Sequence, residues 1–345
     1  MESPHNAPSS DEGQLPRLRP PAPSPPPAPP VKKERTWLHL LLFVLTFVSA
    51  TLPFATSVPG ETPWEAFVTG PLTDPIRLLG GLSFSLPLMA ILLAHEMGHY
   101  ITARRYGVAQ SLPFFIPAPG TFFGTMGAVI MIRSQPPSRP SLFNVAVMGP
   151  YAGMVLALPA AAWGLAHSTP VDPQTLSGST IVFGSSLLFG FLETVFSPNG
   201  TDVFLHPTGL AGWVGFLITS LNLIPAGQLD GGHIAYALLG RYHTWFSRGV
   251  VMALMILAIT LGADGLIWGV WAILLSLFGL RHPPVRDESI PLSGGQRFSA
   301  LVALCLLVIT FTPTPIKVTT AHDTPAPPIE APLPPSPDLH EEFKL

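Results

Sequence analysis

The chain has 345 residues, of which 48% are hydrophobic and only 11% are charged, and its formal net charge is −3. This composition excludes an ordinary soluble protein, and the small net charge with scattered basic residues argues against nucleic acid as a partner. A single cysteine, Cys305, excludes a disulfide or a thiolate metal cluster within one chain. We therefore expect a polytopic membrane protein.

The two ends of the chain differ in composition from its middle. The stretch PRLRPPAPSPPPAPPVKKER (Pro16–Arg35) and the segment after Thr312 are rich in proline and polar residues. Such segments bury too little apolar surface to fold. We therefore expect disordered tails at residues 1–35 and 313–345, with one membrane domain at residues 36–312.

The middle of the chain contains seven apolar runs that we predict to be membrane-spanning helices. Several are shorter than a full crossing, so they need tilt or local thinning of the bilayer. The runs cover residues 36–56, 77–103, 141–167, 209–228, 249–262, 265–280 and 298–311. The predicted fold class is an all-α polytopic membrane protein.

An eighth run, Thr180–Phe196, leaves the number of spans open, because it is short and contains Glu193. If this run does not cross, all basic residues except Arg77, Lys317 and Lys344 lie on the side of the N-terminus. If it crosses, the residues after it change sides and the asymmetry weakens. The positive-inside rule therefore favours seven spans, with the N-terminus in the cytoplasm and the C-terminus outside.

The second predicted span ends in the charged cluster of LLAHEMGHYITARR (Leu92–Arg105). On a helix, His95 and His99 lie one turn apart on one face, so both imidazoles can bind one metal ion. Glu96 is rotated by about 100° and can act on a water at that metal. This H-E-x-x-H spacing predicts one Zn²⁺ per chain near the cytoplasmic face. The alternative is that the histidines only anchor the helix at the interface, but an uncompensated glutamate in a span normally has a function.

The segment Leu112–Ser134 contains prolines, glycines and β-branched residues, and is too broken for a helix. We predict a re-entrant β-hairpin on the cytoplasmic side, with a plain connecting loop as the alternative. An exposed strand edge can pair with an extended chain by β-augmentation. The candidate residues on this edge are Gly124, Gly127 and Val129.

Two asparagines in the predicted spans are further candidates for polar contacts. Asn144 opens the third span, and Asn222 lies two turns before Asp230. Either side-chain amide can donate to a developing oxyanion or hold a substrate backbone. Ordinary interhelical hydrogen bonds are the alternative for both.

A catalytic zinc usually has three protein ligands, so a third ligand is needed. The candidates in or beside apolar runs are Glu193, His206, Asp230 and His233. With seven spans, the fourth span ends on the side of His95, at NLIPAGQLDGGH, whereas Glu193 and His206 fall on the opposite side. Proline and glycines break the helix there, and irregular backbone at membrane depth lines a cavity or is buried in protein. We predict Asp230 as the third ligand, with His233 as an alternative.

These motifs together carry a resemblance to a known family. HEMGH, GTMGAVI (Gly124–Ile130), FNVAVMGPYAG (Phe143–Gly153) and NLIPAGQLDGGH (Asn222–His233) resemble the site-2 protease family of intramembrane zinc metalloproteases. The likeness covers about residues 79–280, and HPP (His282–Pro284) is similar to a feature of the bacterial and plastid branch. Unlike some members, this chain has loops too short for a PDZ or CBS domain.

The resemblance implies a protease core in which zinc is held by His95, His99 and Asp230 while Glu96 is the acid and base. It also implies membrane-spanning substrates, in regulated intramembrane proteolysis. The chemistry follows from the parts as well: zinc activates water and polarises the scissile carbonyl, and Glu96 moves the proton to the leaving amine. Because a helical substrate hides its amides, it must be unwound, and the predicted hairpin edge is the expected template.

We therefore predict a multi-pass protease of the inner or plasma membrane whose partners are the lipid bilayer and a transmembrane substrate. The sequence makes no prediction of an oligomeric state. Two rival functions predict different patterns. A non-catalytic metal transporter or scaffold requires polar residues through several spans. A membrane zincin that cleaves soluble or prenylated proteins would more naturally use a glutamate as its third ligand.

Overall fold

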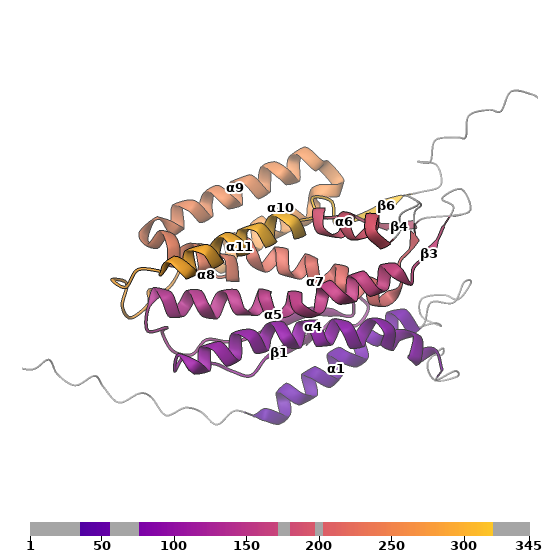
Figure 1. Cartoon of the computed structure of the whole chain (residues 1–345), viewed down its shortest axis with the longest axis horizontal. Coiled ribbons are helices and arrows are strands. Elements are labelled where there is room, and N and C mark those ends of the chain that lie inside the picture. The colour runs from indigo at the N-terminus through magenta and orange to yellow at the C-terminus, as the bar shows by residue number, and fades with distance from the viewer. Residues whose placement is uncertain (1–34, 56–75, 172–179, 197–202, 320–345) are drawn as a thin grey trace, which may run out of the picture. The chain divides into compact units, whose positions relative to one another are not determined.

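The structure is a computed structural model that describes residues 35–55, 76–171, 180–196 and 203–319. Nearly all of the predicted N-terminal tail, residues 1–35, lies outside these ranges. The described chain is mostly helical (Figure 1). Its helices are α1 (Thr36–Ala55), α4 (Arg77–Arg105), α5 (Arg139–Ala166), α6 (Leu187–Phe196), α7 (Pro207–Leu223), α8 (Asp230–Leu239), α9 (His243–Leu261), α10 (Leu266–Phe278) and α11 (Gly294–Thr310).

Four helical stretches are long and apolar enough to cross a membrane. They are Thr36–Phe54, Arg77–Arg105, Arg139–Ala166 and Asp230–Phe278, the last of which joins α8, α9 and α10 through short 3₁₀ turns. Helices α7 and α11 have 17 residues each, which is about 25 Å at 1.5 Å per residue, somewhat less than the hydrocarbon thickness. These findings confirm a helical membrane protein, and the number of seven spans stays a prediction.

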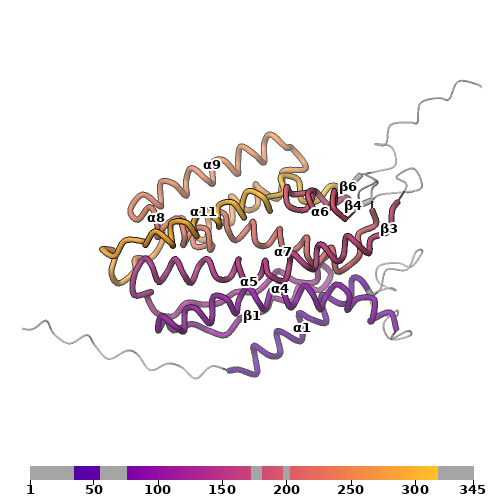
Figure 2. Tube along the Cα trace, viewed as in Figure 1, coloured from indigo at the N-terminus to yellow at the C-terminus, as the bar shows by residue number. Residues whose placement is uncertain are grey.

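Helices α4, α5 and α7 run side by side and contact one another (Figure 2). Small residues let their backbones approach closely. A Cβ on Gly98 of α4 would lie 2.2 Å from the carbonyl oxygen of Met148 on α5, and one on Gly212 of α7 would lie 2.3 Å from the amide nitrogen of Ala161. Helices in lipid associate through such small-residue contacts. The result is a closely packed core along α4, α5 and α7.

The segment predicted to be a hairpin contains two antiparallel strands. Strand β1 (Phe114–Pro117) pairs with β2 (Thr125–Val129), with a bulge between Phe115 and Pro117. The hairpin packs against α1, where the Nδ1 atom of His39 lies 3.1 Å from the carbonyl oxygen of Pro113. Its sheet has only these two strands, so the outer edge of β2 has no strand partner in the described part of the chain. Its re-entry into the membrane stays a prediction.

The ambiguous run Thr180–Phe196 divides into strand β4 (Thr180–Phe183) and helix α6. Helix α6 has 10 residues, so it is about 15 Å long and reaches across only about half of the hydrocarbon core. The carboxylate of Glu193 on α6 accepts a hydrogen bond of 3.0 Å from the Ser185 hydroxyl. A ten-residue helix favours the non-crossing alternative.

The start of the predicted C-terminal tail is structured, which differs from the expectation of disorder from residue 313. Strand β6 (Ile316–Thr319) pairs with β4 in antiparallel register, and the indole nitrogen of Trp268 donates to the carbonyl oxygen of Pro313 at 2.6 Å. The sequence of β6, IKVT, is β-branched at three of its four positions, which suits a strand once a partner is available. Residues 320–345 lie outside the described ranges. Two further short strands, β3 (Thr169–Pro170) and β5 (Val203–Phe204), pair with each other.

Candidate metal centre

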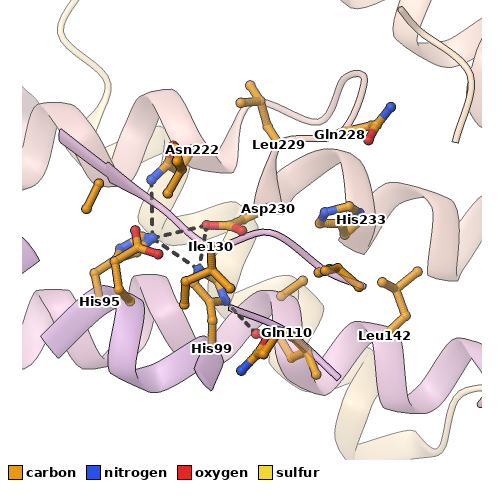
Figure 3. A pocket seen from close by; sticks show the side chains of 16 residues that line it. His95, His99, Gln110, Ile130, Leu142, Asn222, Gln228, Leu229, Asp230 and His233 are labelled. Carbon is orange, nitrogen blue, oxygen red and sulfur yellow. Dashed lines mark hydrogen bonds and ion pairs between the residues drawn. The ribbon is translucent and has the colours of Figure 1, made fainter. Parts of the chain in front are cut away.

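The last turns of α4 carry the residues of the H-E-x-x-H pattern. His95 is buried, with 3% of its surface exposed. Because one helical turn separates His95 from His99, both rings lie on the same face of α4. Their Nε2 atoms are 3.2 Å apart and are directed at a common point (Figure 3).

The carboxylate of Asp230 completes this arrangement. Its Oδ2 atom lies 3.2 Å from Nε2 of His95 and 3.2 Å from Nε2 of His99. Asp230 is the first residue of α8 and follows a tight turn. A Cβ on Gly231 would lie 2.0 Å from the carbonyl oxygen of Leu223, so only glycine allows the chain to turn this closely. The structure therefore brings together the three residues that the sequence predicts as ligands.

The three ligand atoms form a triangle with sides of 3.2 Å. Two atoms that each lie about 2.0 Å from a tetrahedral zinc ion are about 3.3 Å apart, so the triangle has the size of one face of such a site. Two imidazole nitrogens and one carboxylate oxygen are also a donor set that catalytic zinc uses. Within the described residues no other group of three metal-binding side chains comes as close together. The residues fit one zinc ion.

Helix α5 holds the ring of His99 and makes room for both histidines. Nδ1 of His99 lies 2.8 Å from the carbonyl oxygen of Val145. A carbonyl oxygen only accepts, so Nδ1 carries the hydrogen and Nε2 presents a lone pair to the triangle. A Cβ on Gly149 would lie 2.0 Å from Nε2 of His99, and one on Gly153 would lie 3.3 Å from Nδ1 of His95. Two glycines one turn apart on α5 therefore face two histidines one turn apart on α4.

Glu96 lies beside the triangle without belonging to it. Its side chain is buried, with 6% of the residue exposed, and lines the same pocket as the three ligands. Its position next to His95 on the helix turns it away from the shared ligand face. A carboxylate at this place can exchange a proton with a water in the pocket.

Comparison with known proteins supports this arrangement. The family described as peptidase family M50 matches residues 83–262, which is just over half of the chain and includes all three residues of the triangle. The chain belongs to peptidase family M50. This confirms the resemblance to the site-2 protease family that the motifs carry.

Relatives of this M50 chain have names that mention zinc. A protein of Oryza sativa subsp. japonica, "Probable zinc metalloprotease EGY1, chloroplastic", is 29% identical over 295 residues, which cover 80% of this chain and 50% of the relative. "Probable zinc metalloprotease EGY2, chloroplastic" of Arabidopsis thaliana is 32% identical over 222 residues, which cover 62% of this chain and 39% of the relative. The chain thus spans about half or less of the length of these relatives. No solved structure matches the chain significantly.

The triangle of the M50 chain opens into a pocket between the hairpin and α5. Ala128, Val129 and Ile130 line one side, and Leu142, Val145 and Ala146 line another. Of the three predicted edge residues, only Val129 lines this pocket. A Cβ on Gly124 would lie 2.1 Å from the carbonyl oxygen of Ser49, so Gly124 allows the hairpin to pack on α1. Gly127 has a φ of +91° and open space around its Cβ position, so it shapes the strand without lining the pocket.

The two candidate asparagines have different environments. Asn222 lines the pocket, and its Nδ2 atom lies 3.2 Å from Nε2 of His95. Asn144 is absent from the pocket lining. Its amide donates to the hydroxyl of Tyr106 at 2.5 Å and accepts from Gln296 at 3.0 Å. Asn222 therefore lies in the pocket, as a site residue must, whereas Asn144 contacts other segments outside the pocket.

Other pocket residues form contacts that the sequence did not predict. His233, the alternative ligand, lines the pocket, but its Nδ1 atom lies 2.6 Å from Nε2 of His282 and the residue stays outside the triangle. Gln110 also lines the pocket, and its amide donates to the carbonyl oxygen of Tyr100 at 2.8 Å. The HPP motif was the only sequence signal for His282. No signal indicated Gln110, because its place depends on the register at the base of the hairpin.

Proposed function

We propose that this M50 chain is an intramembrane zinc metalloprotease that hydrolyses peptide bonds of transmembrane proteins. The observation that carries the proposal is the triangle of His95, His99 and Asp230 with the carboxylate of Glu96 beside it. A second support is the setting, because the triangle lies at the end of an apolar helix packed among others. The names of the relatives, which mention zinc and proteolysis, agree with this function.

The reaction requires four tasks of the chain's own residues: binding zinc, moving a proton, stabilising the oxyanion and orienting a ligand. Zinc, when bound by the three ligands, supplies a Lewis acid that activates water and polarises the scissile carbonyl. Glu96 takes a proton from the attacking water and delivers it to the leaving amine. Asn222 lines the pocket, and its Nδ2 group can donate a hydrogen bond to the developing oxyanion. The Val145 carbonyl keeps the ring of His99 in the tautomer that binds metal.

The substrate is a helix that must be unwound before its peptide bonds can be attacked, because its amides are bonded within the helix. The outer edge of β2 has no strand partner within the described residues, and Val129 of β2 lines the pocket. We infer that the unwound segment adds to β2 as a strand, which replaces the hydrogen bonds that unwinding removes. In this proposal the hairpin is re-entrant, so that β2 lies at the depth of the membrane where the unwound substrate segment is held.

The distribution of basic residues supports an orientation. Arg104 and Arg105 end α4 one turn after His99, and the other basic residues near the site also favour the cytoplasm under the positive-inside rule. We propose a cytoplasmic N-terminus, seven spans and an active site near the cytoplasmic face of the inner or plasma membrane. Cleavage at this face would release a fragment of the substrate into the cytoplasm. We therefore propose that the chain acts in regulated intramembrane proteolysis.

Two rival functions receive less support. A membrane zincin with a glutamate ligand would need Glu193, but this residue lies on α6, is bonded to Ser185 and has no place in the triangle. A transporter or scaffold would need polar groups along several helices. Among the described residues the metal-binding side chains instead gather in one group.

The proposed function is tested by separating metal binding from proton transfer. Purified chain in proteoliposomes is mixed with a model single-span substrate, and both cleavage and zinc content are measured. We predict that Glu96→Gln lowers the rate by about 10²–10⁴-fold, the usual contribution of acid–base catalysis, and retains zinc. Alanine at any one of the ligands should lower both rate and zinc content. Cleavage by Glu96→Gln at the wild-type rate would refute the mechanism.

A further inference from the structure

The segment that connects α10 to α11, residues 279–293, packs against α8 and is bonded to the stretch just before α5; we call it the return segment. The backbone amides of Arg286 and Asp287 donate to the carbonyl oxygens of Pro136 and Pro137, both at 3.1 Å. Val285 is buried in a cluster with Leu142, which lines the pocket, and with Tyr236 of α8. The return segment is therefore packed against the wall of the pocket.

His282 in this segment holds a defined tautomer. Its Nδ1 atom lies 2.5 Å from the carbonyl oxygen of Pro283. Because a carbonyl oxygen only accepts, Nδ1 of His282 carries the hydrogen. Burial also lowers the pKa of His282 to about 3, with a further contribution from His233, so the ring is neutral at physiological pH. In a neutral imidazole with a hydrogen on Nδ1, Nε2 is an acceptor.

This tautomer determines that of His233. Nε2 of His282 lies 2.6 Å from Nδ1 of His233, so Nδ1 of His233 must donate. Nε2 of His233 is then left as an acceptor, and no residue in the described part of the chain is bonded to it. The two hydrogen bonds therefore run in one direction, from His233 to His282 to the carbonyl of Pro283.

The ring of His282 is also locked in its plane. It stacks on the ring of Tyr236 with 4.1 Å between centroids and an interplanar angle of 12°. The hydroxyl of Tyr236 in turn donates to the carboxylate of Glu288 at 2.5 Å, which ties α8 to the return segment a second time. A histidine fixed by a stack and by two hydrogen bonds is suited to hold a neighbour in one orientation.

His233 lines the pocket with apolar neighbours such as Ile130 and Leu142 (Figure 3). A strand added to β2 forms hydrogen bonds on one side only, and its other backbone amides would enter an apolar wall unpaired. An unpaired buried amide is costly. We propose that His282 is a positioning residue that fixes His233 as a hydrogen-bond acceptor, and that Nε2 of His233 binds a backbone N–H of the unwound substrate. This inference rests on the proposed function, whose substrate-binding step it specifies.

The test uses two matched variants of His282 in the full-length chain. His282→Phe keeps a ring to stack on Tyr236 but removes the acceptor, whereas His282→Gln keeps an acceptor near the position of Nε2. Loss of one hydrogen bond to the substrate should lower kcat/KM by about tenfold in His282→Phe. His282→Gln should recover most of the activity. Zinc content should be equal in wild type and both variants, because neither changes a ligand.

A double-mutant cycle separates positioning from a general structural role. His233→Ala should lower kcat/KM as much as His282→Phe, and adding His282→Phe to His233→Ala should cause little further loss. Additive losses, or wild-type activity in His282→Phe, would overturn the proposal.

A second readout does not depend on activity. Imidazole ¹⁵N spectra of the metal-free protein should show a hydrogen on Nδ1 and a bare Nε2 for His233, and His282→Phe should remove this preference. A hydrogen on Nε2 of His233 in the wild type would overturn the inference. If the wild type cleaves nothing, the proposed function fails, while the spectra still decide the tautomer.

Discussion

Replacing Gly149 by alanine should disable the metal centre from a neighbouring helix. The new Cβ would lie 2.0 Å from Nε2 of His99. Ordinary contact begins near 3.4 Å, so this nitrogen or α5 must move by about 1.4 Å, whereas a metal site tolerates displacements of only about 0.2 Å. A shift of α5 gives no relief, because it would pull the Val145 carbonyl from Nδ1 of His99. We predict that zinc affinity falls by at least about 100-fold, more than the usual effect of a residue outside the ligand set.

Gly153→Ala is the matched control, since it makes the same chemical change one turn further along α5. Its Cβ would lie 3.3 Å from Nδ1 of His95, a tight contact that a small adjustment relieves. Zinc content is measured by mass spectrometry after equilibration in a series of zinc–chelator buffers, and thermal unfolding reports the fold. Alanine favours the helix over glycine, so neither variant should lose α5. Equal zinc affinity in Gly149→Ala and wild type would refute the reasoning.

Two further predictions concern the substrate. Val129→Pro removes a backbone donor beside the pocket and should lower cleavage without loss of zinc, whereas Val129→Ala keeps the donor and should cleave nearly normally. A normal cleavage rate in the proline variant would show that the hairpin only connects two helices and does not bind the substrate. Asn222→Ala should lower kcat by about 10²-fold if its amide stabilises the oxyanion, while Asn144→Ala, outside the pocket, should leave kcat unchanged. Equal effects of the two asparagines on kcat would remove Asn222 from the mechanism.

Local spacing was sufficient to predict the parts of the site that α4 supplies. The i to i+4 relation of His95 and His99 is a property of any helix, and a long apolar run predicts a helix. Asp230 can be predicted for a different reason. Proline and glycine mark a break in a span, and such a break must be buried or line a cavity. The hairpin followed from the same kind of local signal.

The remaining contacts depend on how distant segments meet, which one sequence does not encode locally. By its position in the sequence, Asn144 resembles a site residue. Its amide oxygen instead accepts a hydrogen bond from Gln296, which lies 152 residues further along the chain. Strand β6 falls within the predicted tail, because the strand that pairs with it, β4, lies far away in the chain. His282 could be noticed as part of a motif, but its role depends on the path of the return segment over α8. A sequence can therefore indicate the ligands, whereas the contacts that surround them become known only from the structure.

Helix α5 has a consequence for which movements of the chain would disturb the metal centre. It bonds the ring of His99 through Val145, and through Arg139 it binds the last carbonyls of α8, Ala237 and Leu238, at 2.8 and 2.9 Å. The two segments that supply the ligands, α4 and α8, are therefore both held in position by α5. Helix α1 takes part in none of these three hydrogen bonds. A displacement of α1 would therefore break none of the contacts by which α5 aligns the two ligand-bearing segments.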